Sequence, residues 1–154
     1  MEPGTLGQPV GVGDVRIVLE RGATADDAAH AIEEGLRDFN ARFLGPRPTE
    51  LRFVFSARDA DGAVVGGLVA DVWRRWYRVD TLWVADAHRG RGVGRTLMAR
   101  AEAAAQAYEC LGIWLDTADF QARPFYERLG FTVFGELRDS PPGHVTYFMQ
   151  RRLR

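Results

Sequence analysis

The chain has 154 residues, of which 46% are hydrophobic and 27% charged, so its composition is that of one globular domain and excludes a disordered or fibrous chain. Its 20 basic and 21 acidic residues give a net charge of -1, which argues against nucleic acid or a membrane as a partner held by a general positive field. All basic residues are arginines, so Schiff-base chemistry on a lysine is excluded. The single cysteine and three scattered histidines exclude a disulfide framework and a Cys/His zinc site. We therefore expect no metal.

The first 13 residues are rich in glycine and proline and lack the apolar run of a signal peptide or a membrane anchor. We expect residues 1–13 to form a flexible tail of a cytoplasmic protein. Residues 14–154 then form a single domain.

The first elements of this domain are a strand and a long helix. Val15, Ile17 and Leu19 alternate with polar or flexible neighbours, as in a strand. Thr24 is placed to cap a helix that stops at Gly45-Pro46. The apolar face of this helix consists of Ile32, Leu36, Phe39 and Phe43.

Three further strands follow. The first contains Phe53 and Phe55, and the turn signal Asp61-Gly62 joins it to a longer strand over Ala63–Trp73, which Gly66-Gly67 is expected to bend. After a turn at Arg74-Arg75, the nearly continuous apolar run of Val79–Val84 predicts a central strand.

The second half of the chain alternates helices and strands. A glycine-rich turn over Arg89–Gly94 leads directly into a helix whose apolar residues recur at helical spacing. The later elements are a strand over Ile113–Asp116, a short helix over Pro124–Leu129, and strands over Phe131–Phe134 and Val145–Met149.

The glycine-rich turn is suited to binding an anion. Its glycines allow a ligand close to the backbone, and successive N–H groups at a helix start point toward negative charge, so a pyrophosphate fits. Arg89, Arg91 and Arg95 add positive charge. The turn lacks both the three-glycine spacing of dinucleotide-binding folds and the lysine of phosphate loops.

Two motifs of the sequence resemble the GNAT superfamily of N-acetyltransferases. The family signature, Arg or Gln, two residues, Gly, one residue, Gly or Ala, is matched by Arg89, Gly92 and Gly94. The segment ARPFYERLGF, Ala122–Phe131, resembles the short helix with its tyrosine and the entry into the next strand. Phe120-Gln121-Ala122 and the turn Pro141–His144 are similar to those of a group of small members.

The resemblance implies an α/β (α+β) fold with a mixed, mostly antiparallel sheet of about seven strands, flanked by helices and splayed between the fourth and fifth strands. It also implies acetyl-CoA as cosubstrate, its pyrophosphate on the turn and its pantetheine arm along the fourth strand. The cofactor-binding residues are then Leu82, Trp83, Val84, Arg89, Gly90, Arg91, Gly92, Val93, Gly94 and Arg95.

Acyl transfer by direct attack needs a neutral amine and an acid that protonates the leaving thiolate. The resemblance gives the acid role to Tyr126, although a tyrosine next to a phenylalanine is also typical of a core pair. Asp80, on the fourth strand, is our candidate base, with Asp116, His144 or a water chain as alternatives.

Asp119 departs from the family pattern, which often has an asparagine at this position. An ionised carboxylate cannot donate a hydrogen bond to the cofactor, so we expect Asp119 to cap the following helix or to face substrate.

The acceptor wall is expected from the exit of the first helix and from the aromatic turn Trp73–Tyr77. Phe39, Trp76, Asp116 and His144 are the candidate substrate-binding residues. Clustered aromatics are equally typical of packing across a hairpin.

The sequence thus predicts an N-acetyltransferase acting on a primary amine of a small molecule or a peptide. Two alternatives remain at this point, a non-catalytic acyl-CoA sensor and an interaction module. An exposed last strand would also permit a homodimer.

Overall fold

The computed structural model describes residues 9–45 and 51–153, which belong to two units, Met1–Pro48 and Thr49–Arg154. In the first unit, β1 (Val10–Val12) pairs antiparallel with β2 (Val15–Ile17), and α1 (Ala23–Leu44) follows. Residues 1–8 of the expected tail lie outside the described residues.

Two details of the first unit differ from the sequence predictions. The expected first strand pairs with Val10–Val12 in a separate two-stranded sheet, so it is not a strand of the main sheet. The N-cap of α1 is Gly22 and not the predicted Thr24. Thr24 lies inside the first turn, where its hydroxyl donates to the Arg21 carbonyl. The helix ends before Gly45, as predicted.

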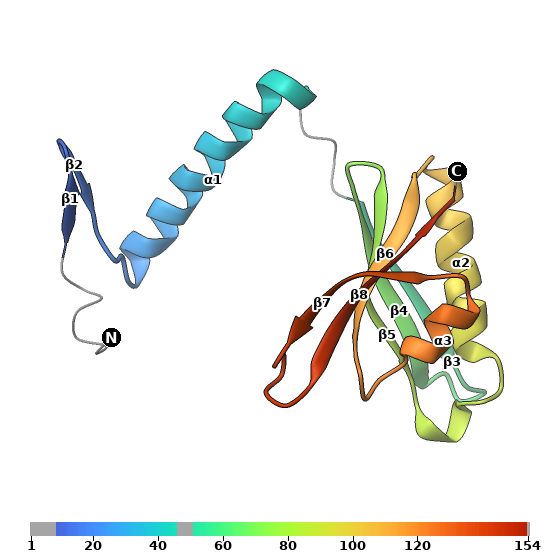
Figure 1. Cartoon of the computed structure of the whole chain (residues 1–154). Coiled ribbons are helices and arrows are strands. Elements are labelled where there is room, and N and C mark those ends of the chain that lie inside the picture. The colour runs from blue at the N-terminus through green and yellow to red at the C-terminus, as the bar shows by residue number, and fades with distance from the viewer. Residues whose placement is uncertain (1–8, 46–50, 154) are drawn as a thin grey trace. The chain divides into compact units, whose positions relative to one another are not determined.

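The second unit is built on a six-stranded mixed sheet in the order β3-β4-β5-β6-β8-β7 (Figure 1). Among the described strands, β5 and β6 alone are parallel neighbours. The last strand lies between β6 and β7, so the expectation of an exposed last strand was wrong, and β3 and β7 form the edges. The strands are β3 (Leu51–Arg58), β4 (Val64–Trp73), β5 (Trp76–Val84), β6 (Gly112–Ala118), β7 (Thr132–Arg138) and β8 (Val145–Arg152).

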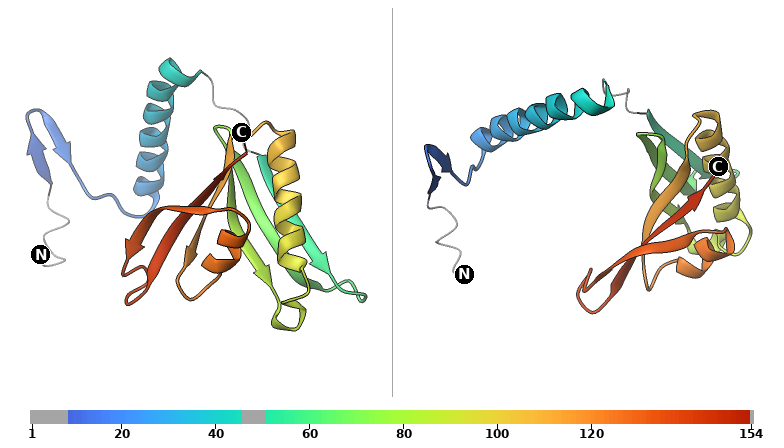
Figure 2. Two further views of the ribbon diagram at one scale, coloured as in Figure 1. Left: turned by 45° about the vertical axis from the view of Figure 1, so that its right-hand side comes forward. Right: turned by 45° about the horizontal axis from the view of Figure 1, so that its top comes forward.

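Two helices cover one face of this sheet. The further views in Figure 2 show α2 (Val93–Ala107) and α3 (Arg123–Arg128) on the same side. A 3-10 turn, η2 (Asp86–His88), precedes the glycine-rich turn. No helix in the described parts of the chain is both long enough and apolar enough to cross a membrane.

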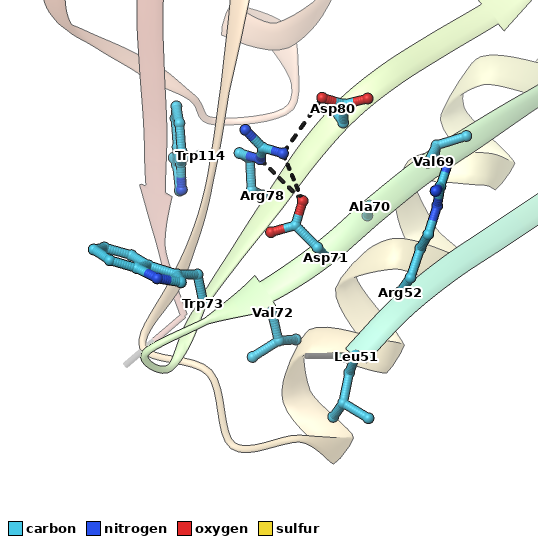
Figure 3. Close-up of a pocket in the computed structure, with 10 residues that line it drawn as sticks. All are labelled: Leu51, Arg52, Val69, Ala70, Asp71, Val72, Trp73, Arg78, Asp80 and Trp114. Atoms are coloured by element: carbon cyan, nitrogen blue, oxygen red, sulfur yellow. Dashed lines mark hydrogen bonds and ion pairs between the residues drawn. The ribbon is translucent and has the colours of Figure 1, made fainter. Parts of the chain in front are cut away.

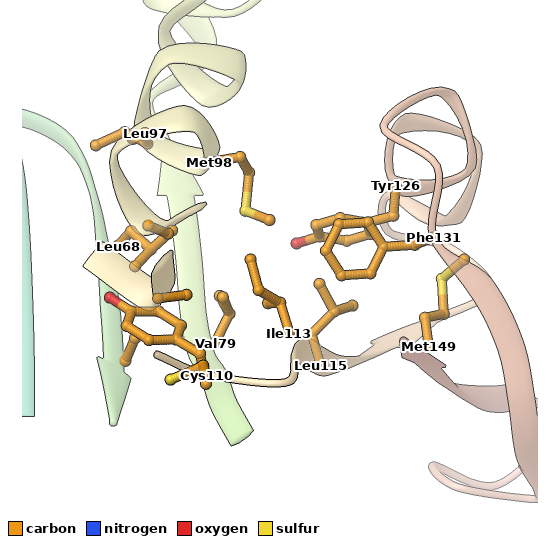
Figure 4. Close-up of a cluster of buried hydrophobic side chains, with 14 residues drawn as sticks. Leu68, Val79, Leu97, Met98, Cys110, Ile113, Leu115, Tyr126, Phe131 and Met149 are labelled. Atoms are coloured by element: carbon orange, nitrogen blue, oxygen red, sulfur yellow. The ribbon is translucent and has the colours of Figure 1, made fainter. Parts of the chain in front are cut away.

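The core fills the space between these helices and the sheet (Figure 4). Leu97, Met98 and Ala101 of α2 pack with inward residues of β4, β5 and β6, and Tyr126 of α3 joins the same cluster. Burial of these apolar side chains is the main source of stability for the unit. It also fixes α2 and α3 relative to the strands that carry the site.

The glycine pair of β4 has a packing role rather than the expected bending role. Gly66 and Gly67 stay in register with both neighbouring strands. A Cβ atom at Gly66 would lie 2.9 Å from the carbonyl oxygen of Trp83, and one at Gly67 2.8 Å from that of Phe55. Both positions therefore need glycine because of the close approach of the neighbouring backbones.

The sheet splays where the sequence resemblance places it. The parallel ladder of β5 and β6 runs only from the Trp76–Gly112 pair to the Val79–Leu115 pair. Both strands continue beyond these pairs without pairing with each other. Apart from the Val84 carbonyl, which accepts from Arg89, the backbone polar groups of residues 80–84 on this edge of β5 are therefore available to a ligand.

A β-bulge lies at the point where the splay begins. Val69 pairs with Thr81, whereas the next residue, Ala70, pairs with Val79, so Asp80 has no partner in the ladder. A bulge reverses the alternation of side chains along the strand. Leu82 and Val84 consequently pack against the core, and Trp83 is exposed.

Candidate active site

The glycine-rich turn forms an anion cradle at the start of α2. Gly90 and Gly92 have φ values of 71° and 84°, a backbone conformation that favours glycine, and Gly92 is the N-cap of the 15-residue helix. Within the described residues, the N–H groups of residues 93–95 donate no hydrogen bond to the protein. These free donors and the helix dipole make the turn fit a pyrophosphate.

Arginines add to the cradle in different ways. The Arg89 guanidinium turns back: its Nε donates to the Val84 carbonyl at 2.9 Å, and Nη1 lies 2.9 Å from Asp86 Oδ1. Arg89 thus fixes the turn to the end of β5. Arg91 and Arg95 are exposed beside the helix start.

Tyr126 lies on α3, with only 6% of its surface exposed. Its ring packs edge-on against Phe125 and Phe131. Burial, with a smaller effect of the negative charge of Asp116, raises the pKa of Tyr126 to about 12. The hydroxyl therefore stays protonated at neutral pH, as a proton donor to a ligand requires.

The end of β6 determines where α3 begins. The Gln121 side-chain oxygen accepts hydrogen bonds from the Ala118 N–H at 2.8 Å and from the Thr117 hydroxyl at 3.3 Å. The Ala122 N–H in turn donates to the Thr117 hydroxyl at 3.3 Å. This network explains the Phe-Gln-Ala segment structurally, because Gln121 closes the turn that aims α3 and its tyrosine at the core.

Asp80 belongs to a cluster of charges on the sheet face opposite α2. The Arg78 guanidinium donates to Asp71 Oδ2 from Nε at 3.0 Å and from Nη2 at 2.9 Å. Asp80 is held more loosely, with its Oδ1 3.5 Å from Arg78 Nη2 and its Oδ2 accepting from the Thr81 hydroxyl at 3.2 Å. Asp80 is thus paired with an arginine of its own strand.

These side chains line a cavity of about 500 Å³ (Figure 3). Asp71, Arg78 and Asp80 lie on one wall, and the indoles of Trp73 and Trp114 stand beside Arg78. Because Arg78 and Trp114 are paired in the last part of the parallel ladder, the cavity opens at the start of the splay. A small molecule bound here would lie next to the gap between β5 and β6.

The comparisons with known proteins agree with this geometry. Residues 15–131 match the acetyltransferase (GNAT) family. The chain belongs to the GNAT acetyltransferase family.

Its relatives include a blasticidin-S acetyltransferase of Streptomyces morookaense, 39% identical over 108 residues that cover 70% of this chain and 79% of the relative. An acetyltransferase of Agrobacterium fabrum is 35% identical over 127 residues, 82% of this chain and 91% of that protein. The crystal structure of an acetyltransferase from Bacillus cereus superposes with a TM-score of 0.80 at 26% identity, covering 89% of this chain and 98% of the other.

The protein is therefore an N-acetyltransferase that uses acetyl-CoA as cosubstrate. Family membership decides between the three functions that the sequence left open, in favour of the enzyme. The splayed mixed sheet predicted for this family is confirmed, with six strands in the main sheet.

The other candidate residues of this GNAT enzyme lie on separate elements. Asp116 is exposed on β6, in register with Phe148 of β8, and Trp76 opens β5, with Arg152 5.4 Å from its ring. Phe39 lies on α1, in the other unit, with its ring 5.4 Å from that of Phe43. Asp116 and Trp76 do not line the cavity beside Asp80.

His144 and Asp119 form a clamp between β6 and β8. Asp119 Oδ1 is 2.9 Å from His144 Nδ1, and its Oδ2 accepts from the Val145 N–H at 3.2 Å. Desolvation raises the pKa of Asp119, but the hydrogen bonds from His144 and from backbone N–H groups outweigh it and lower that pKa. The N-cap of α3 is Ala122, so the expectation that Asp119 caps this helix was wrong.

Asp71, Arg78 and Trp114 are cavity residues that the sequence reasoning missed. The ion pair joins neighbouring strands, and Trp114 comes from a third strand. Only the strand register brings these residues together. One local pattern indicates the sheet face of the cavity. In β6, Trp114 and Asp116 alternate with buried residues, so both belong to the face opposite the core.

Proposed function

We propose that this enzyme acetylates a primary amine of a small-molecule antibiotic such as blasticidin S. The substrate in the name of its 39% identical relative supports this choice. The cavity of about 500 Å³ has the size of a small-molecule site.

The cofactor is proposed to lie along the splay. The free N–H groups at the start of α2, with Arg91 and Arg95, hold its pyrophosphate. Leu82, Trp83 and Val84 offer backbone groups on the unpaired edge of β5 to its pantetheine arm. When bound, acetyl-CoA supplies an acetyl group activated as a thioester.

Two side chains are proposed to move protons. Asp80 accepts the proton of the incoming amine, either directly or through water, because its carboxylate is held only loosely by Arg78 and lies where the splay begins. Tyr126 donates its phenolic proton to the sulfur of the leaving thiolate. The observation that carries this proposal is the end of the β5–β6 ladder at Val79 and Leu115, next to the cavity that Asp80 and Trp114 line.

Thiol release from acetyl-CoA in the presence of blasticidin S tests the function. We expect acceptor-dependent release by the intact chain, and a loss of about 10²–10⁴-fold in kcat for Asp80→Asn. Asp61→Asn is the matched control, because this exposed turn residue precedes Gly62 and asparagine suits such a turn.

The two halves of this proposal fail separately. No release with blasticidin S would refute this acceptor, and a panel of amines, amino acids, polyamines and other antibiotics would then be tested in its place. Release that is unchanged in Asp80→Asn would assign proton removal to Asp116, His144 or water.

A further inference from the structure

Resting on the proposed function, we infer that the cavity beside Asp80 selects an acceptor that carries one ammonium group and a planar ring. Asp80 binds the ammonium, and the indoles of Trp73 and Trp114 bind the ring. This assigns a substrate class to the cavity and a specificity role to two tryptophans.

The cavity is lined by two carboxylates, Asp71 and Asp80, and by two guanidinium groups, Arg52 and Arg78, so its charges balance and it has room for one added positive group at most. Asp71 is already occupied, because one of its oxygens accepts two hydrogen bonds from Arg78. Asp80 keeps only longer contacts, at 3.5 Å and 3.2 Å. An ammonium group can therefore gain one strong partner here, Asp80, while a second ammonium finds no second free carboxylate on this wall.

The indoles provide the surface for a ring. Trp73 is 56% exposed although it lines the cavity, and Trp114 is only partly buried. Figure 3 shows both indoles on the same side of Arg78, away from Val69. The Arg78 guanidinium lies 5.9 Å from the Trp114 ring centroid, so a cation already occupies one position at this ring.

The two groups lie at a distance that one small molecule can span. Asp80 lies two residues beyond Arg78 on β5, and Arg78 is in register with Trp114 of the neighbouring strand β6. Neighbouring strands are about 4.8 Å apart, and residues two positions apart in a strand are separated by about 7 Å. A ring joined to an amine by a two-carbon linker matches these spacings.

Two primary amines, 2-phenylethylamine and hexylamine, test this inference, because they differ mainly in the ring. With acetyl-CoA, we expect a kcat/KM about tenfold higher for the aromatic amine, the size of one favourable aromatic contact. Trp73→Leu and Trp114→Leu should each reduce this preference by raising KM for 2-phenylethylamine alone, with kcat retained. Trp73→Phe should restore part of it, and Phe134→Leu, an exposed aromatic on β7, should leave it unchanged.

Binding is measured independently of turnover. In NMR spectra of the chain with saturating CoA, 2-phenylethylamine should shift the indole N–H signals of Trp73 and Trp114, and spermidine should bind no more tightly than hexylamine. An equal kcat/KM for the two amines, or indole signals that do not move, would overturn the inference. Shifted indole signals without acetyl transfer to any amine would instead refute the proposed function and leave the ring site standing.

Discussion

Tyr126 combines a place in the core with a reactive hydroxyl. The same burial that packs its ring against Phe125 and Phe131 raises its pKa to about 12. A buried phenol that stays neutral can lend its proton when negative charge develops on a nearby sulfur. The structural and the catalytic interpretation of this tyrosine are therefore compatible.

Replacing Tyr126 by phenylalanine separates these two roles. Tyr126→Phe keeps the ring in the core, so we expect nearly unchanged thermal stability and acetyl-CoA affinity, with kcat lowered by about 10²–10⁴-fold. Turnover, melting temperature and CoA affinity are measured together. Full turnover by a folded variant would remove Tyr126 from the mechanism.

The raised pKa of Tyr126 also predicts a loss of stability in alkali. The folded state favours the neutral phenol, so this contribution is complete below the unfolded pKa of about 10 and is lost as the pH rises through about 12. The full shift corresponds to about 2–3 kcal/mol in the free energy of unfolding. Between pH of about 9 and 12, urea unfolding should show a smaller loss for Tyr126→Phe than for the unmodified chain. Equal losses would contradict the raised pKa.

Single residues were predictable from the sequence when their role is local. The turn glycines and Tyr126 belong to short motifs, and they occupy the expected elements. Asp119 was assigned to the wrong partner because its hydrogen bonds go to His144 and Val145, far along the chain. Such pairings follow from sheet topology, which no local pattern encodes.

At the scale of elements, the glycine-rich turn and the start of α2 together form the anion cradle. The left-handed conformation of Gly92 allows the chain to enter the helix with its first N–H groups free. Arg89 fixes this turn to the carbonyl of Val84, at the end of β5. The position of the cradle is therefore coupled to the strand that borders the splay.

Substitution of Gly92 tests the role of this cradle in cofactor binding. In Gly92→Val, a β-branched residue must adopt a φ of 84°, which distorts the turn, and we expect acetyl-CoA affinity to fall by tenfold or more, about 1.4 kcal/mol per factor of ten. Isothermal titration calorimetry measures this affinity. Gly35→Ala, on α1 with open space around its Cα, is the control. Retention of full affinity by Gly92→Val would show that the cofactor does not bind this turn.

The order and type of the elements were largely predictable, because periodicity and turn residues identify strands and helices locally. The position of the bulge at Asp80 follows from the pairing of β4 with β5, which no local pattern encodes. The C-terminal ends of β7 and β8 extend beyond the predicted ranges, because the two strands pair with each other over nearly their whole length.

At the scale of the whole molecule, the chain divides into a small N-terminal unit and the unit that carries the cradle, Asp80 and Tyr126. The sequence predicted a single domain after residue 13, together with a strand that proved to pair with Val10–Val12. The predicted boundary at residue 13 falls inside the β1–β2 hairpin, because the alternating valines of this hairpin lie on both sides of Asp14.

Removal of residues 1–13 tests whether the tail contributes to folding. The described strand β1 is exposed along its length and buries little apolar surface, so a chain starting at Asp14 should melt within a few degrees of the full chain. Differential scanning calorimetry gives both melting temperatures. A large decrease would show that this segment packs against the rest of the protein.

The central claim is that acetyl-CoA binds in the splay between β5 and β6, with its pyrophosphate at the start of α2. Hydrogen–deuterium exchange, measured on the full chain with and without acetyl-CoA, tests it directly. We predict slower exchange at the N–H groups of residues 90–95 and 80–84, with little change in β7. Unchanged exchange at residues 80–84, with protection of β3 residues 54–57 instead, would contradict the account.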